Sequence, residues 1–130
     1  MMQAGEAARG YLCANYHAAG THFPLIQEML KYVYAQGQGP GPERDVGTAP
    51  WIRGMLRALL TTEAIRTAMR QFGNQPLTGV QVQWGFEHLT ITPASLKELG
   101  AEGLISPITL SCRDHEGGRG VKFQQWDGMQ

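Results

Sequence analysis

The chain has 130 residues, which is the length of one domain, and its 11 Lys and Arg residues are balanced by 11 Asp and Glu residues. With a formal net charge of zero, it has no overall field to attract nucleic acid or an anionic membrane, and we expect neither as a partner. Its hydrophobic content of 42% is that of a globular protein, and no apolar run has the length of a membrane-spanning helix.

Two elements are predicted in the first part of the chain. Residues 11–17, YLCANYH, precede Ala-Ala-Gly and are typical of a short strand that ends at a turn. Between Pro24 and Gln36 apolar residues recur at helical spacing, and Gly37 follows just beyond the end. Residues 37–47, GQGPGPERDVG, are too rich in glycine and proline for regular structure, so we predict a loop between two helices.

The stretch from Thr48 to Gly73 predicts the longest helix. Thr48 can supply an N-cap oxygen, Pro50 suits the first turn, and Gly73 can adopt the left-handed conformation that ends a helix. Its apolar residues form one stripe that we expect to be buried: Ile52, Met55, Leu56, Leu59, Leu60, Ile65, Met69 and Phe72. Four arginines fall mostly outside the stripe, and a solvated basic face is favoured over an anion site: Arg53, Arg57, Arg66 and Arg70.

Shorter elements are predicted in the last part of the chain. Thr78 and Gln81 have the spacing of a capping box, which predicts a third helix through Val82, Phe86 and Leu89. Thr92-Pro93 begins one or two further turns that stop at Gly100. Residues 105–112 alternate as a strand would, and residues 121–126 suggest a final strand, joined to the previous one through RDHEGGRG.

Catalytic and metal motifs are weak. His17 and His22 flank one turn and His115 lies near Cys112, but these spacings do not match those that hold zinc, so we expect no metal. No Ser or Cys lies in a glycine elbow, and neither glycine cluster is a phosphate-binding loop. The residues therefore favour a binding or interaction role over an enzyme, without a cofactor.

The two cysteines, Cys13 and Cys112, are compatible with a disulfide, a metal pair or two thiols. The first residues, MMQAGEAARG, lack the basic start and apolar core of a signal peptide. A chain without an export signal stays in the cytoplasm, where cysteines are kept reduced. We therefore expect two free, buried thiols.

Several segments occur in an order that resembles one protein family. They are EAARGYLCANYHAAGTHFPLIQEMLKYVYAQG, RALLTTEAIRTAMRQFG, PLTGVQVQWGFEHL and SCRDHEGGRGVKFQQWDG. By these segments the chain resembles the carboxy-terminal third of the substrate-binding proteins of branched-chain amino-acid ABC transporters, which are type I periplasmic binding proteins similar to leucine-binding protein. The resemblance extends from about Gly5 to Gly128.

The resemblance implies an α/β fold, namely a helix-rich part of the type I periplasmic-binding-protein fold with a few short strands. The family has two lobes that close on a ligand, so residues 1–130 would be a single fragment of a two-lobed domain. Residues 11–17 would be a strand at a crossing segment between the lobes. Residues 24–99 would supply helices of one lobe, and residues 104–126 would be terminal strands that return through the hinge.

Four residues are the candidate ligand-binding positions that the resemblance implies. Tyr16 and His17 would lie at the crossing, and Trp51 and Arg53 would lie at the start of the long helix. Trp51 could pack on a ligand side chain, and Arg53 could pair with a carboxylate. From its area alone, an aromatic side chain is more often packing than part of a ligand cage.

The implied function is capture of a small solute between the lobes for import. The solute would be an amino acid, an amide or an aromatic acid, and the implied partners are a membrane permease and the remaining lobe-forming segment. The full-length parent would be periplasmic. Two alternatives stay open, a stand-alone intracellular binding or interaction module and a zinc-dependent enzyme.

Overall fold

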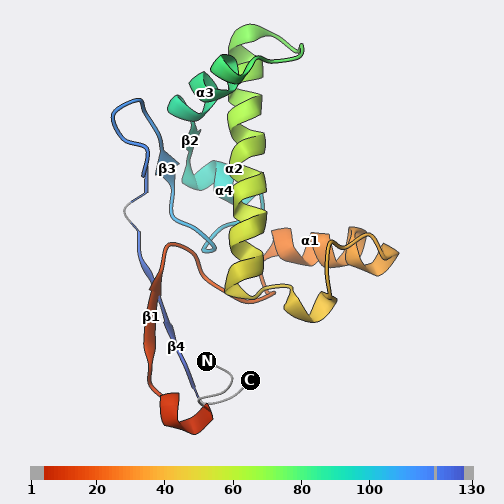
Figure 1. Ribbon diagram of the computed structural model, residues 1–130, viewed down its shortest axis with the longest axis vertical. Helices are drawn as coiled ribbons and strands as arrows, with labels where there is room; N and C mark the ends of the chain where they lie inside the picture. Colours follow the sequence, from red (N-terminus) through yellow and green to blue (C-terminus); the bar gives the residue numbers. More distant parts are fainter. Residues whose placement is uncertain (1–4, 119, 128–130) are drawn as a thin grey trace.

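A computed structural model describes residues 5–118 and 120–127 as a small mixed domain of helices and strands (Figure 1). The helices are α1 (Pro24–Tyr32), α2 (Ala49–Phe72), α3 (Gly79–Glu87) and α4 (Pro93–Glu98). Three short 3-10 turns are η1 (Gly5–Ala8), η2 (Tyr34–Gln36) and η3 (Glu43–Asp45). The strands are β1 (Leu12–Asn15), β2 (Thr90–Ile91), β3 (Ile108–Thr109) and β4 (Lys122–Gln125).

The long helix α2 begins and ends where the sequence predicts. Pro50 lies in its first turn, and Gly73 follows its last residue with φ of 92° and ψ of 164°, a positive-φ conformation that favours glycine but is not the left-handed helical one. Thr48 occupies the N-cap position, but its hydroxyl donates a hydrogen bond to the carbonyl oxygen of Asp45 at 2.6 Å. The expectation that the Thr48 side chain caps the helix is therefore wrong, because the preceding turn uses that hydroxyl.

The predicted capping box of α3 is confirmed. The Thr78 hydroxyl accepts from the Gln81 amide at 3.3 Å, and the Gln81 side-chain oxygen accepts from the Thr78 amide at 2.8 Å. The Thr92 hydroxyl likewise accepts from the Ser95 amide at 3.1 Å at the start of α4. The helix predicted for residues 24–36 divides into α1 and η2, and the loop predicted for residues 37–47 contains η3.

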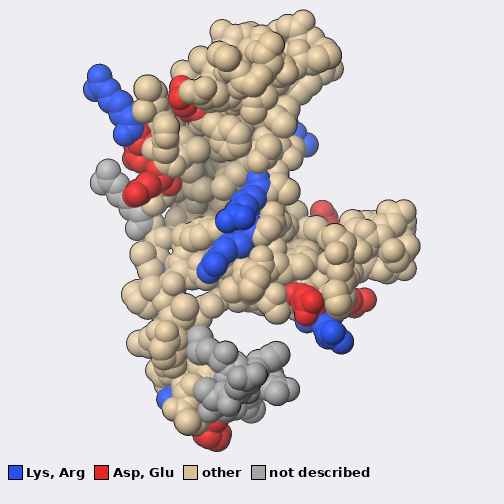
Figure 2. Space-filling view, viewed as in Figure 1, with Lys and Arg blue, Asp and Glu red and all other residues tan. Residues whose placement is uncertain are grey.

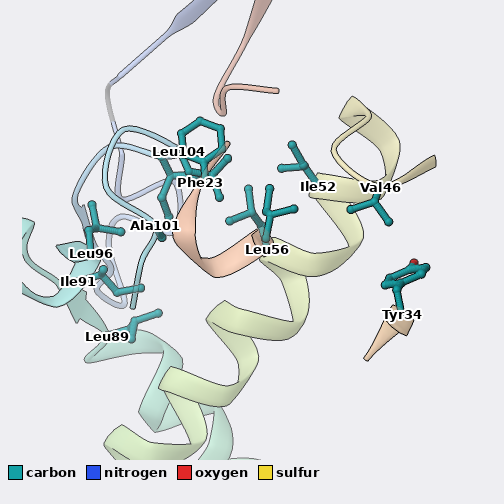
Figure 3. Packing of buried hydrophobic residues seen from close by; sticks show 12 residues of the cluster. Phe23, Tyr34, Val46, Ile52, Leu56, Leu89, Ile91, Leu96, Ala101 and Leu104 are labelled. Carbon is teal, nitrogen blue, oxygen red and sulfur yellow. The ribbon is translucent and has the colours of Figure 1, made fainter. Parts of the chain in front are cut away.

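The hydrophobic core lies on one side of the first half of α2 (Figure 3). Ile52 and Leu56 are fully buried there, and Figure 3 shows Phe23, Ala101 and Leu104 gathered beside them. The core continues along α2 to residues of the β2 and α4 region, which are Leu89, Ile91 and Leu96. The four arginines of α2 are exposed, so the predicted solvated basic face is confirmed.

The second half of α2 packs through small residues. Ala64 and Ala68 are fully buried, whereas Ile65, Met69 and Phe72 are only half-buried. A Cβ atom on Gly85 of α3 would collide with the carbonyl oxygen of Ala64, so the two helices approach at backbone distance. The prediction of a fully buried stripe of large residues is wrong for this half, because the close approach of α3 selects residues without bulk.

The strands pair differently from the sequence expectation. β1 pairs antiparallel with β4, so that Ala14 lies opposite Phe123, and β2 pairs antiparallel with β3. The final strand is therefore not paired with the strand that precedes it, and only Ile108–Thr109 of residues 105–112 forms a strand. Figure 1 shows the ribbon of β1 and β4 extending beyond the start of α2, away from α3.

The cysteines also differ from expectation in part. Both cysteines are free thiols, as expected. Cys13 is half-buried and Cys112 is exposed in the turn after β3, so the expectation that both are buried is wrong. Among the described residues, none of the helices has the length and apolar character that crossing a membrane requires.

Candidate functional site

An open cavity with a volume of about 920 Å³ lies at the start of α2. It lies between the loop before α2, the first turn of α2 and the end of β4. Its lining residues are mostly aromatic or proline: Tyr34, Pro40, Gly41, Pro42, Asp45, Thr48, Ala49, Pro50, Trp51 and Trp126.

Tyr34 and Trp51 form the ordered aromatic part of this cavity. The indole N–H of Trp51 donates to the Tyr34 hydroxyl at 2.9 Å, and the two ring centroids are 6.4 Å apart. Tyr34 is buried, and Gly39 lies so close to its ring that a Cβ atom there would collide with it. Glycine at position 39 therefore allows the chain to pass directly over the ring.

The lining defines what the cavity can bind. Asp45 is the only charged side chain among its described lining residues, which include no Ser, Cys or His. Aromatic and proline surfaces favour an apolar group, and one exposed carboxylate at the edge favours a ligand without negative charge. This chemistry fits the holding of a ligand or an apolar segment.

The four residues predicted to bind a ligand do not gather around one cavity. Trp51 lines the cavity at the start of α2, whereas Tyr16 lines a second cavity of about 280 Å³ with Leu56, Leu60 and Ile105. Arg53 is exposed on α2 and lines neither of these cavities. Their role in ligand binding stays a prediction.

His17 is enclosed within the domain. It is 0% exposed, pairs with Ile105 in a single antiparallel bridge, and meets the Tyr16 ring edge-on at 4.9 Å between centroids. Its Nδ1–H donates to the Ala18 carbonyl oxygen at 2.8 Å, while Nε2 is buried and has no hydrogen-bond partner among the described residues. A ligand could reach this ring only if the surrounding chain moved.

Sequence reasoning missed most of the cavity lining. Tyr34 was placed within the first helix, and Asp45 within a loop without an assigned role. Trp126 comes from the opposite end of the chain. The density of proline around Trp51 was the available signal, since a proline-rich loop beside an aromatic residue often forms a wall of a pocket. Among the described residues, no group of three or more metal-ligating side chains is found.

Comparison with known proteins gives one match of high similarity. The chain is 39% identical to a solved structure described as an ABC transporter permease from the Pseudomonas fluorescens group, with a TM-score of 0.93. The match covers 100% of this chain and 32% of that one, so the chain spans about a third of its neighbour's length. No protein-family model matches the sequence. No curated protein sequence matches it either.

This neighbour corrects two expectations. It is described as a permease and not as a substrate-binding protein, so the assignment to the branched-chain amino-acid binding proteins is wrong. The function that this assignment implies, capture of a solute between two lobes, is therefore wrong as well. The alternative of a stand-alone module agrees no better with a permease neighbour. The order of helices and strands that suggested the family is a property of folds, and one fold can carry many functions.

Proposed function

We propose that this chain works in an ABC transporter, as a segment of a component of the permease kind. The observation that carries the proposal is the match at 39% identity over the whole chain to a solved protein with that description. At this identity and a TM-score of 0.93, the two chains share their backbone from β1 to β4.

We further propose that the chain is one part of a larger α/β protein. Support comes from the lengths, because most of the neighbour lies outside the matched segment. In this proposal α2 is a scaffold, and the cavity lined by Tyr34, Trp51 and Trp126 accommodates an apolar group from elsewhere in the transporter. The role is one of binding and assembly, since the cavity lining is aromatic and proline-rich rather than acid and base.

The test is to isolate the tagged chain, after mild cross-linking, from cells that produce it. We expect the ATP-hydrolysing subunit of an ABC transporter to co-purify and to be identified by mass spectrometry. Leu56→Asp should abolish recovery because it disrupts the core, whereas Arg57→Ala, an exposed change on the same helix, should preserve it. A folded chain that co-purifies with no transporter subunit would contradict the proposal.

A further inference from the structure

The β1–β4 ribbon has two faces of opposite character. Residues directly opposite each other in an antiparallel pair point to the same side, and successive residues alternate. The register of Leu12 with Gln125 and of Ala14 with Phe123 therefore defines one face, which we call the outer face. Val121, directly before β4, continues the same alternation. The inner face carries Cys13, Asn15, Lys122 and Gln124.

The outer face is apolar and exposed. Leu12 is 59% exposed, Phe123 is 71% and Val121 is 58%. These are three of the seven large hydrophobic side chains that are exposed among the described residues. Figure 2 shows that the visible surface of the ribbon is mostly uncharged, whereas basic side chains lie over α2. Such a concentration marks a surface that is covered in the working protein.

The inner face is polar and yet more buried. Asn15 is buried, while Cys13, Lys122 and Gln124 are half-buried. A sheet of a finished domain normally places its apolar face against the core and its polar face toward water. In the ribbon the exposed side chains Leu12 and Phe123 are apolar, whereas the more buried residues of the inner face are mostly polar. These exposed apolar side chains suit a further packing surface that the described residues do not supply.

Both ribbon edges are also open. In the described part of the chain, β1 and β4 form a sheet of two strands, so each has one side without a strand partner. An isolated two-stranded ribbon is marginal in water, and an unpaired edge is a template for another strand. A lipid surface would leave these edge N–H and C=O groups unsatisfied, which argues against a membrane as the cover.

The ribbon is attached to the rest of the domain at the end near the helices. There the Ala18 amide donates to the Leu104 carbonyl oxygen at 2.8 Å, beside the bridge between His17 and Ile105. At the other end, the Gly10 amide donates to the Trp126 carbonyl oxygen at 2.8 Å, which continues the pairing of the two strands. The outer face is therefore positioned by the attachment at residues 17–18 and 104–105.

We infer that the outer face of the ribbon binds the remainder of a larger transporter protein. That partner packs an apolar surface on the outer face and pairs one of its own strands with an open edge of the ribbon. This inference rests on the proposed function. The choice of occupant follows from the neighbour, because that protein contains the whole of this segment and most of its length lies outside the match. A second copy of this chain is the competing occupant, and the test separates the two.

The test measures the reactivity of one thiol in two settings. The first is the isolated 130-residue chain, and the second is the solved neighbour's full-length protein with its matching segment replaced by this chain. Phe123→Cys, in a background of Cys13→Ser and Cys112→Ser, supplies the thiol on the outer face. Val80→Cys on α3, at a position 77% exposed, is the matched control.

We expect a maleimide to label the Phe123→Cys thiol rapidly in the isolated chain and at least about 30-fold more slowly in the chimera, because reaction there requires local opening. The Val80→Cys rate should be the same in both settings. Equal labelling at position 123 in a folded chimera would overturn the inference. Protection that rises with concentration of the isolated chain would assign the face to a second copy, and protection by phosphatidylcholine vesicles would assign it to a membrane; both overturn it.

If the chimera does not fold, a second measurement tests the inference. This chain is co-expressed with the rest of the neighbour's sequence, and a 1:1 complex is expected. The complex should be lost with the Leu12→Ser and Phe123→Ser pair and kept with Val80→Ser, and failure of all forms to associate would overturn the inference. Neither measurement requires transport, so a protected thiol without any transporter subunit would contradict the proposed function alone.

Discussion

The helical part of the molecule and the β1–β4 ribbon differ in how far their large apolar side chains are exposed to water. Around the first half of α2, large side chains such as Ile52 and Leu56 are removed from water by residues of the same chain. On the ribbon, Leu12 and Phe123 are as apolar but lie more than half exposed. The large apolar residues around the first half of α2 are thus buried by residues of the same chain, whereas those of the ribbon stay exposed.

The two regions also differ in their source of order. The helices have caps, small-residue contacts and a core, so their stability is local to this chain. The ribbon depends on its own hydrogen bonds and on its attachment at residues 17–18 and 104–105. Substitutions in the two regions should therefore have very different effects on the stability of the isolated chain.

The largest difference is expected between Leu56→Asp and Leu12→Asp. Leu56 is 1% exposed, so an unpaired carboxylate there should cost more than about 4 kcal/mol and abolish the cooperative transition. The same change at Leu12 should alter the free energy of unfolding by less than about 0.5 kcal/mol, because the side chain is already in water. Urea unfolding followed by circular dichroism measures both, and equal losses would refute the distinction between the regions.

A smaller effect is expected for Gly85→Ala. The added methyl group would meet the carbonyl oxygen of Ala64, which is backbone and cannot rotate away, so we expect a loss of about 1–3 kcal/mol. Gly54→Ala is the matched control, because nothing lies near that position within α2 and alanine is the better helix former, by about 0.5–1 kcal/mol. Thermal melting should shift in opposite directions, and a neutral Gly85→Ala would disprove the close helix contact.

A still smaller difference in the free energy of unfolding is expected between the threonines at the N-cap positions of α3 and α2. Thr78→Ala removes a side-chain cap from α3 and should cost about 1 kcal/mol. Thr48→Ala removes only an exposed bond to the Asp45 carbonyl oxygen, so we expect a loss within about 0.5 kcal/mol. Chemical unfolding of the two variants provides the comparison, and a larger loss at Thr48 would mean that its hydroxyl caps α2 in solution.

Much of the helical part could be predicted from the sequence, because its signals are local. Helix boundaries are marked by residues that lie close to them. Thr78 with Gln81 marks the start of α3, and Thr92 with Pro93 marks the start of α4. Pro50 marks the start of α2, and Gly73 marks its end. The buried small residues could not be predicted in this way. Ala64 and Gly85 are selected by the approach of two helices, and hydrophobic periodicity gives most weight to large side chains.

The ribbon and the cavity were beyond sequence reasoning for a different reason. β1 and β4 come from opposite ends of the chain, so no turn between them signals their pairing. The cavity likewise combines Trp51 with Trp126. Long-range pairing is not encoded in local propensity. Four sequence segments in a family-like order suggest a functional family, and the comparison with a solved permease contradicts it.

The most direct test of an independent helical core and a dependent ribbon is native-state hydrogen exchange of the isolated chain. We predict that amides of α2 near Leu56 exchange only through global unfolding. Amides of the β1–β4 ladder should exchange through local opening, with a free energy lower by at least about 2 kcal/mol. Equal exchange free energies in the ribbon and in α2 would contradict the account, because the ribbon would then share the core's stability without a further partner.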